Sequence, residues 1–324
     1  MATSGFLPVI HGAAADRPDE ADTVIAAEAI HAALGRLGWR SEILHLGLDL
    51  SPLQALAARR PAAVFNLVEA LAGDCALAPL APAVFGHLGL RYTGGPAESL
   101  NLTLSKTSAK RLLRAEGLPT PAWSETGEGL DGAGHAIVKS LTEHASLGID
   151  AGSVVAAVDA AAEIARRQRR FGGRFFAEAF VEGREFNLSV IERDGRPHVL
   201  PPAEIDFVDY PDDRPRIVDY EAKWGAGSFA FDHTPRRFAF PTSDMPLVAR
   251  LEELARRCWT AFGLRGYARV DFRVDREGEP WILEINVNPC LSPDAGFAAA
   301  AAHDGLDFDA MVGRIVDAAL AGNA

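Results

Sequence analysis

The sequence has little cysteine and no long apolar run. Its three cysteines, Cys75, Cys258 and Cys290, lie far apart and match neither a metal-ligand spacing nor a disulfide framework. A reducing cytoplasm is therefore the expected location. The N-terminal stretch "MATSGFLPVIHG" lacks a basic flank and a long apolar core, and the alanine run at 298–302 is too short to span a bilayer. We expect neither a membrane segment nor an export signal.

Basic residues are also scarce. The 324 residues contain 32 Lys and Arg against 44 Asp and Glu, which gives a formal net charge of -12. A field of this sign repels nucleic acid, so we expect no nucleic-acid partner. The one dense basic stretch, "ARRQRR" at 165–170, is interpreted as a solvated helix end. With 48% hydrophobic residues, the chain is long enough to form two or three packed subdomains.

Strand-like and helix-like patterns alternate through the first hundred residues. The expected strands and helices, in chain order, cover residues 6–10, 20–37, 41–46, 52–59 and 62–67, with a further helix ending near 89. Alternation of this kind predicts a parallel α/β sheet. The short strand and glycine turn "RYTGG" then close a first domain near residue 100.

The rest of the chain mixes helices and strands without regular alternation. The expected elements are helices at 105–116, 156–169, 246–262 and 308–320, strands at 136–139, 174–181, 185–191 and 197–200, and a hairpin at 267–290. The loop at 140–149 is a candidate lid, and a long acidic loop precedes the third of these helices. We predict an α/β domain at 1–100 and two α+β domains at 101–182 and 183–324.

The hairpin "YARVDFRVDREGEPWILEINVNPC" alternates polar and apolar residues on both arms. Arg269, Asp271 and Arg273 share one face of the first arm. On the second arm Trp281, Leu283, Ile285 and Val287 are expected on one face and Glu284, Asn286 and Asn288 on the other. A connection of two or four residues would bring Asp271, Glu284 and Asn286 together.

Two carboxylates side by side are costly to desolvate unless they are protonated, paired to a cation or bound to a metal. Oxygen donors of this type suit magnesium, which also binds substrate phosphates. Phosphates would need positive charge, for which Lys106, Lys139 and Lys223 are candidates. The alternative is a salt-bridged solvent face in which Arg269 pairs with Glu284.

Several stretches carry a resemblance to a known family. They are "LRYTGGPAESLNLTLSKTSAKRLLRAEGLPTPAW", "AIVKSLTEHASLGI", "FFAEAFVEGREFNLSV", "VDYEAKW", "ARVDFRVDREGEPWILEINVNP" and "AAHDGLDFDAMVGRIVDAAL". In order and spacing the sequence resembles the ATP-grasp superfamily and, within it, the D-alanine–D-alanine ligases. The resemblance implies a three-domain ATP-grasp architecture, in which an N-terminal parallel α/β domain precedes two α+β domains that clasp ATP. It also implies a homodimer.

The resemblance assigns roles to matching residues. Lys106 and Lys139 would contact the nucleotide phosphates, and Lys223 would close over the γ-phosphate. The groups implied to read the base and ribose are Glu178, the backbone of Ala179 and Val181, and Glu185. Asp271, Glu284 and Asn286 would hold two magnesium ions, or manganese in their place.

The family's reaction, taken as an implication, joins a carboxylate to an amine. The carboxylate attacks the γ-phosphorus to give an acyl phosphate, and the amine then displaces phosphate through a tetrahedral intermediate. Lysines and metal would stabilise the first step, and Arg269 would serve as oxyanion donor in the second. The loop "EHASLG" would cover the phosphates through backbone N–H groups, with Ser146 matching a family serine and Gly148 supplying backbone freedom.

The sequence departs from the family where the substrates would bind. The family's His-Gly and Gly-Gly-x-Ser-x-Glu signatures are replaced by "FNLVEALAGDCALAP" and "VIHGAAADRPDEAD". Candidate substrate residues are Glu69, Ser292 and Asp294, and the candidates for an ammonium-binding acid are Asp16, Asp19 and Glu20. Cys290 replaces a family glycine and is otherwise a small buried filler, while Trp224 replaces a tyrosine.

We interpret these departures as a retained ATP half and an altered substrate half. The expected activity is ligation of an amino acid, dipeptide or small amine-bearing metabolite. A true D-alanine–D-alanine ligase with diverged loops and a non-catalytic ATP-binding regulatory protein are the alternatives.

Overall fold

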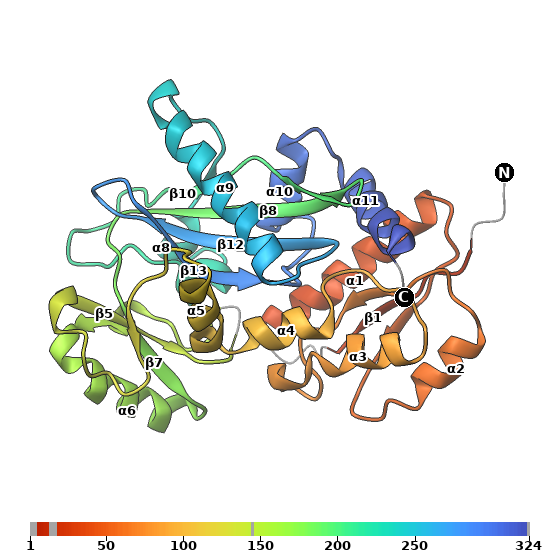
Figure 1. The fold of residues 1–324 in the computed structure, drawn as a ribbon, viewed down its shortest axis with the longest axis horizontal. Coiled ribbons are helices and arrows are strands. Elements are labelled where there is room, and N and C mark those ends of the chain that lie inside the picture. Colours follow the sequence, from red (N-terminus) through yellow and green to blue (C-terminus); the bar gives the residue numbers. More distant parts are fainter. Residues whose placement is uncertain (1–4, 13–17, 144–145, 323–324) are drawn as a thin grey trace.

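The computed structural model describes residues 5–12, 18–143 and 146–322, and its strands form three sheets (Figure 1). Each of the three predicted domain ranges contains one of these sheets. Within the described residues, no helix combines the length and the apolar composition that crossing a membrane requires. The mixed α/β and α+β architecture predicted from the sequence is confirmed.

The first sheet is parallel, as the alternating pattern predicted. Its strand order is β2-β1-β3, and the elements are β1 (Val9–His11), α1 (Pro18–Arg36), β2 (Ile43–His45), α2 (Pro52–Ala58), β3 (Phe65–Leu67) and α3 (Leu80–His87). Alternate residues of the central strand enter different cores. Val9 packs with α1, whereas Ile10 packs with α2 and α3. Both faces are therefore buried, which explains the apolar character of these strands.

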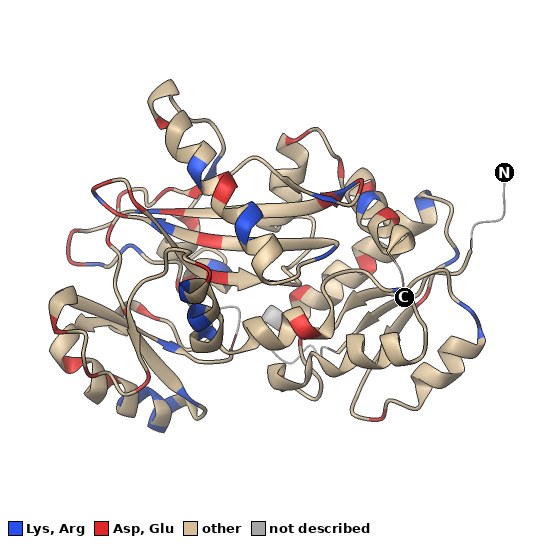
Figure 2. Cartoon of the chain, in the orientation of Figure 1, with Lys and Arg blue, Asp and Glu red and all other residues tan. Residues whose placement is uncertain are grey.

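The second sheet has the order β4-β7-β5-β6 and is antiparallel. Its elements are β4 (Trp123–Ser124), β5 (His135–Ser140), β6 (Val154–Ala156), α6 (Ala160–Phe171) and β7 (Phe175–Ala179). The α6 helix buries Ala160 and Ile164 against Val138 and Ala177. Figure 2 shows basic residues along α6. Most of this basic run is exposed as predicted, but Arg167 is fully buried.

The third sheet is the largest. It runs β11-β10-β8-β12-β13, with β9 also paired to β8. The strands are β8 (Arg184–Arg193), β9 (Arg196–Val199), β10 (Ala203–Ile205), β11 (Arg236–Arg237), β12 (Tyr267–Val274) and β13 (Pro280–Asn286). The α5 helix (Lys106–Ala115) and the α9 helix (Met245–Ala261) pack on one face of this sheet. The other face carries the polar residues of the hairpin.

The hairpin differs in detail from the sequence-based prediction. Its connection spans residues 275–279, which is neither two nor four residues. Asp271 nevertheless pairs with Glu284, because a bulge at Leu283 shifts the register between Asp271 and Phe272. The predicted apolar face is therefore wrong for part of β13, since Ile282 is in the core and Leu283 lines a cavity.

The N-terminal sheet shares its core with helices from the end of the chain. Residues of α10 (Gly296–His303) and α11 (Phe308–Ala321) pack with Val9 and Phe65. The alanine run, too weakly apolar to suggest a membrane span, forms most of α10. The remaining short helices are α4 (Ala97–Leu104), α7 (Tyr220–Trp224), α8 (Phe229–Asp232) and the 3-10 turns Cys75–Leu77, Asp131–Ala133, Ala151–Ser153, Ala157–Asp159 and Thr242–Asp244.

Candidate active site

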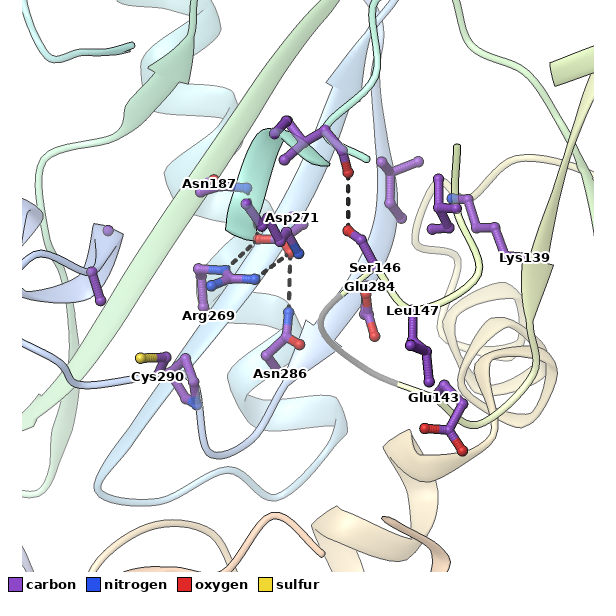
Figure 3. Close-up of a pocket in the computed structure, with 18 of the residues that line it drawn as sticks. Lys139, Glu143, Ser146, Leu147, Asn187, Arg269, Asp271, Glu284, Asn286 and Cys290 are labelled. Carbon is purple, nitrogen blue, oxygen red and sulfur yellow. Dashed lines mark hydrogen bonds and ion pairs between the residues drawn. The ribbon is translucent and has the colours of Figure 1, made fainter. Parts of the chain in front are cut away.

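A cavity of about 540 Å³ lies where elements of the three sheets meet. The cavity is lined by all the residues predicted for catalysis or metal binding, by the predicted nucleotide-binding residues other than Ala179, and by Glu69, Ser292 and Asp294 among the predicted substrate residues. The Ala179 N–H donates to the carbonyl of Ala122, 2.8 Å away. Side chains from the loop after β5 and from the β12–β13 hairpin approach one another in this region (Figure 3).

Asp271 is the centre of the polar hairpin face (Figure 3). Arg269 donates two bonds to its carboxylate, at 2.7 Å from Nε and 2.8 Å from Nη2. The amides of Asn187 and Asn286 donate to the same carboxylate at 2.8 and 3.1 Å. Burial alone would lower the pKa of Arg269, but the bonded Asp271 raises it overall. The alternative pairing of Arg269 with Glu284 is therefore not the one adopted.

The possible metal ligands are two carboxylates and one amide. Asp271 and Glu284 are direct partners in the hairpin register, and Asn286 is next on the same face. Among the described residues, no group of three His, Cys, Asp or Glu could hold a metal by itself. The donor set nevertheless fits Mg²⁺, because this ion accepts hard oxygen donors and usually takes only one or two carboxylates, with water and phosphate oxygens completing its shell.

Two of the predicted lysines, Lys106 and Lys139, form ion pairs with acidic residues that line the cavity. Lys106 donates to the carbonyl of Glu143 at 2.6 Å, and its Nζ lies 3.2 Å from Glu284 Oε1. Lys139 lies 2.8 Å from Glu178 Oε1. Lys106 therefore links α5 and the loop after β5 to the hairpin, whereas the Lys139–Glu178 pair lies within the second sheet.

Glu178 has a second cation that the sequence pattern did not reveal. Lys110 is fully buried, pairs with Glu178 and donates to Thr120 Oγ1 at 2.8 Å. Burial lowers the pKa of Lys110. Burial alone would raise the pKa of Glu178, but Lys110 and Lys139 together lower it. The sequence did contain a signal for this pair, because Lys110 lies on the buried face of the amphipathic α5 helix.

Glu185 lines the cavity beside another buried cation. Arg273 Nε lies 3.3 Å from Glu185 Oε2, and Arg273 Nη1 donates to the carbonyl of Gly183. Burial raises the pKa of Glu185, despite the neighbouring Arg273. Asn187, two residues further along β8, completes this polar edge and was missed because an isolated asparagine in a strand carries little information.

The loop after β5 is bound to the segment that leads into α7. The hydroxyl of Ser146 donates to the carbonyl of Val218 at 2.9 Å, and the N–H of Tyr220 donates to the carbonyl of Ile149 at 3.2 Å. Gly148 has a φ of 72°, a conformation that suits glycine. Residues 144–145, part of the predicted phosphate-covering loop, lie outside the described residues.

The α7 helix positions Lys223 at the cavity. The Asp219 carboxylate accepts the N–H of Ala222 at 2.8 Å and so caps the helix N-terminus. Burial, and then the positive charge of Arg269, lower the pKa of Lys223. Trp224 follows on the same helix and also lines the cavity.

An acid of α1 reaches the cavity at its other end. Asp22 accepts bonds from Cys290 Sγ and Ser292 Oγ, both at 2.7 Å. Burial, together with the charges of Asp22 and Glu69, raises the pKa of the Cys290 thiol. The acidic stretch "DRPDEAD" was the signal for this corner, but only the fold decides which acid faces inward.

The sequence suggests Asp16, Asp19 and Glu20 as candidates for the ammonium-binding acid of this corner. Asp16 and the side chain of Asp19 lie outside the described residues. Glu20 is described but does not line the cavity. Glu69 and Ser292 do line it, beside Asp22.

The sequence is similar to those of known D-alanine–D-alanine ligases. Residues 135–317 match the family model for the D-ala D-ala ligase C-terminus. A D-alanine–D-alanine ligase of Chromohalobacter salexigens is 33% identical over 71% of this chain and 69% of its own length. One from a Synechococcus strain is 30% identical over 91% of this chain and 88% of its own length.

Solved structures share the fold. A Bacillus anthracis D-alanine–D-alanine ligase crystallised with ATP has a TM-score of 0.74 at 19% identity, with 98% of each chain covered. The D-alanyl-alanine synthetase A of Vibrio cholerae has a TM-score of 0.76 at 15% identity, covering 99% of this chain and all of the other. Together with the sequence matches, these likenesses show that the chain belongs to the D-alanine–D-alanine ligase family and is an ATP-grasp ligase that forms carbon–nitrogen bonds.

Proposed function

We propose that the chain uses Mg-ATP to join a donor carboxylate to an acceptor amine, with an amino acid or a small amine-bearing metabolite among its substrates. The observation that carries this proposal is the convergence of Lys106, Lys139, Lys223, Arg269 and the Asp271–Glu284 pair on one cavity. If the chain had lost its catalytic activity, at least one of these residues would be expected to be replaced. The relatives' names support the same class of reaction.

In the first step the donor carboxylate oxygen attacks the γ-phosphorus, and the bond to the ADP oxygen breaks. Lys106 and Lys139 bind the phosphates, and Lys223 approaches the γ-phosphate from α7. Phosphoryl transfer depends mainly on such positioning and charge stabilisation. Val181 and the backbone at Ala179 would bind the adenine, with Glu178 at its amino edge and Glu185 at the ribose.

Asp271, Glu284 and Asn286 would hold two magnesium ions, and these ions would supply positive charge to the phosphate oxygens. Asn286 would bind through its carbonyl oxygen, since its amide nitrogen donates to Asp271. Arg269 and Asn187 orient the Asp271 carboxylate toward this role through their hydrogen bonds.

In the second step the acceptor amine attacks the acyl carbon, phosphate leaves, and the amine loses a proton. Arg269 stabilises the oxyanion of the tetrahedral intermediate from the hairpin face. Ser146 holds the covering loop against the segment before α7 through its bond to Val218. This contact keeps water from the acyl phosphate while the second substrate binds.

The corner formed by Asp22, Glu69 and Ser292 would bind the polar groups of the donor. The Asp22 carboxylate receives only neutral donors, Cys290 and Ser292, among the described side chains. A donor substrate that carries an ammonium group would therefore be attracted to the negative charge of Asp22. Ser292 belongs to this corner through its bond to Asp22, while Asp294 lines the cavity as an exposed residue.

The second candidate function is D-alanine–D-alanine ligation itself. It is favoured by the names of relatives that are 30–33% identical over most of this chain. The altered donor corner favours a different amino acid. The homodimer, the cytoplasmic location and the three domain ranges 1–100, 101–182 and 183–324 stay predictions.

The test measures ADP and phosphate release from purified protein with Mg-ATP. D-alanine alone is one arm, and pools of amino acids, dipeptides and amines are the others, with mass detection of products. A product lighter than its two components by one water identifies both substrates. Release with D-alanine alone would assign the second candidate function, and ATP binding without release in every pool would contradict the proposal.

A further inference from the structure

Lys110 is a buried lysine that has no role in the reaction described so far. It lies on α5, its side chain is 1% exposed, and it is not among the described residues that line the cavity. Any effect of Lys110 on a bound nucleotide must therefore pass through another residue. The role inferred for Lys110 rests on the proposed function, in which Glu178 faces the adenine and Lys139 binds the phosphates.

One carboxylate is shared by two ammonium groups in this part of the site. Glu178 pairs with Lys139 through its Oε1, at 2.8 Å, and with Lys110 through its Oε2. Two positive charges on one negative charge leave the cluster with a net positive charge. Of the two lysines, only Lys139 lines the cavity. Lys139 is therefore the member of the cluster that can reach a ligand.

Lys110 is fixed by a chain of hydrogen bonds that ends on the hairpin. Its Nζ donates to Thr120 Oγ1 at 2.8 Å, and the Thr120 hydroxyl donates to the carbonyl of Ile282 at 2.8 Å. The N–H of Ile282 in turn donates to the carbonyl of Pro119 at 2.9 Å. Leu113, on the same buried face of α5, packs in the core of the third sheet. The ammonium group of Lys110 is therefore held at Glu178.

The phosphate role of Lys139 requires it to leave Glu178. Burial alone would raise the pKa of the Glu178 carboxyl, but the charge of Lys110, and then that of Lys139, lower it overall. Burial lowers the pKa of Lys110, and the like charge of Lys139 lowers it further. When Lys139 moves to a phosphate, this repulsion ends and Glu178 keeps a buried partner.

The same movement would be costly without Lys110. Glu178 is 2% exposed, and a buried carboxylate that loses its only partner is strongly destabilised. Lys139 would then be held at Glu178, or Glu178 would have to take up a proton. We propose that Lys110 is a positioning residue that neutralises Glu178 when Lys139 leaves it for the nucleotide phosphates. The Lys110–Glu178 pair thus controls how tightly the triphosphate binds, although Lys110 does not touch it.

The experiment compares ATP with adenosine, which has the base and ribose but no phosphate. Binding of each labelled ligand is measured with Mg²⁺ by equilibrium dialysis. Lys110→Met keeps the length of the side chain and removes its charge. It should lower ATP affinity by roughly 10- to 100-fold, the effect of losing one charge-assisted bond to phosphate. Adenosine affinity should not change, because adenosine leaves Lys139 at Glu178.

A second substitution separates this role from a structural one. Glu178→Gln removes the charge that retains Lys139, so adding it to Lys110→Met should restore part of the lost ATP affinity. Glu178→Gln alone and the double variant should bind ATP equally, because Lys110 acts only through the charge of Glu178. This equality tests the proposal even if Lys110→Met alone does not fold, since neutral replacement of a buried ion pair is often tolerated.

The matched control is Arg111→Met, which removes an exposed arginine of the same helix that pairs with Glu125. It should bind both ligands as wild type does. Three results would overturn the proposal: an equal loss for ATP and adenosine in Lys110→Met, an unchanged ATP affinity in that variant, or weaker ATP binding by the double variant than by Glu178→Gln.

These binding measurements need no turnover, so they keep the role of Lys110 separate from the proposed function. The predicted affinities without product in any substrate pool would support the role of Lys110 and contradict only the ligation. Product formation together with an unchanged ATP affinity in Lys110→Met would contradict only the role of Lys110.

Discussion

Asp271 lies directly opposite Glu284 because a single bulge at Leu283 interrupts the alternation of β13. Counted strictly from the buried Ile282, Glu284 would point into the core of the third sheet. The extra residue turns Glu284 and Asn286 toward the cavity and leaves Ile285 in the core. The bulge therefore places two carboxylates on one face and keeps the hydrophobic packing behind them.

Glu284→Gln tests the metal ligands. The substitution keeps the shape of the side chain but removes the charge that would hold a cation, so ATP-dependent phosphate release should fall by roughly 100-fold or more. Binding of Mn²⁺, followed by electron paramagnetic resonance, should weaken in parallel. Glu277→Gln removes the same charge from the exposed turn of the hairpin and should change neither quantity. Unaltered Mn²⁺ binding in Glu284→Gln would refute the ligand assignment.

Lys223→Ala tests the closing segment. If Lys223 contacts the γ-phosphate only when the segment closes over the reacting complex, kcat should fall more than ATP affinity does. Steady-state kinetics and equilibrium binding of ATP separate the two effects. A loss of affinity equal to the loss of kcat would show that Lys223 binds the ground state as strongly as the transition state.

The lowered pKa of Lys223 predicts an alkaline limit to activity. Burial favours the neutral amine, so Lys223 loses its charge at a lower pH than an ordinary lysine. If the charged form is required, kcat/KM should decline as pH rises through this lowered value, because kcat/KM reports the free enzyme. Lys223→Arg stays charged and should move the decline to higher pH. An unchanged profile in that variant would assign the limit to another group.

Arg167 should anchor the loop that follows β5. It donates to the carbonyl of Gly148 and pairs with Asp150 at 2.6 Å and Glu163 at 2.5 Å. Arg167→Leu leaves the Gly148 carbonyl without this donor, while Glu163 keeps two bonds from Arg166 at 2.7 Å, so the free energy of unfolding should fall by about 1–3 kcal/mol. Limited proteolysis should also become faster near Gly148. Arg169→Leu, an exposed neighbour, should change stability by less than about 0.5 kcal/mol.

Cys290 should react slowly with alkylating reagents. Burial and the nearby carboxylates raise its pKa, so the reactive thiolate is scarce at pH 8. In a Cys75→Ser, Cys258→Ser background, iodoacetamide should modify Cys290 at least about tenfold more slowly than a small thiol, as followed by mass spectrometry. Asp22→Asn should accelerate the reaction. Rapid alkylation of the parent protein would contradict the acidic environment described for Cys290.

The sequence predicted most elements because their periodicity is local. The parallel first sheet, the amphipathic α5 and the hairpin follow from residue spacing that any chain of this pattern would bury in the same way. The α10 helix was not predicted because alanine carries little amphipathic signal. Its burial against the first sheet depends on residues more than two hundred positions earlier.

The sequence by itself determined which chemical groups are available: lysines, paired acids and an arginine at spacings that match the ligase family. Only the tertiary structure decided which of them meet. Asp22 reaches Cys290, and Lys110 is buried against Glu178, across separations that local pattern cannot encode. The physical reason is that periodicity fixes which face of an element is apolar, whereas the partners of its polar groups depend on how separate elements pack and on local breaks such as the bulge at Leu283.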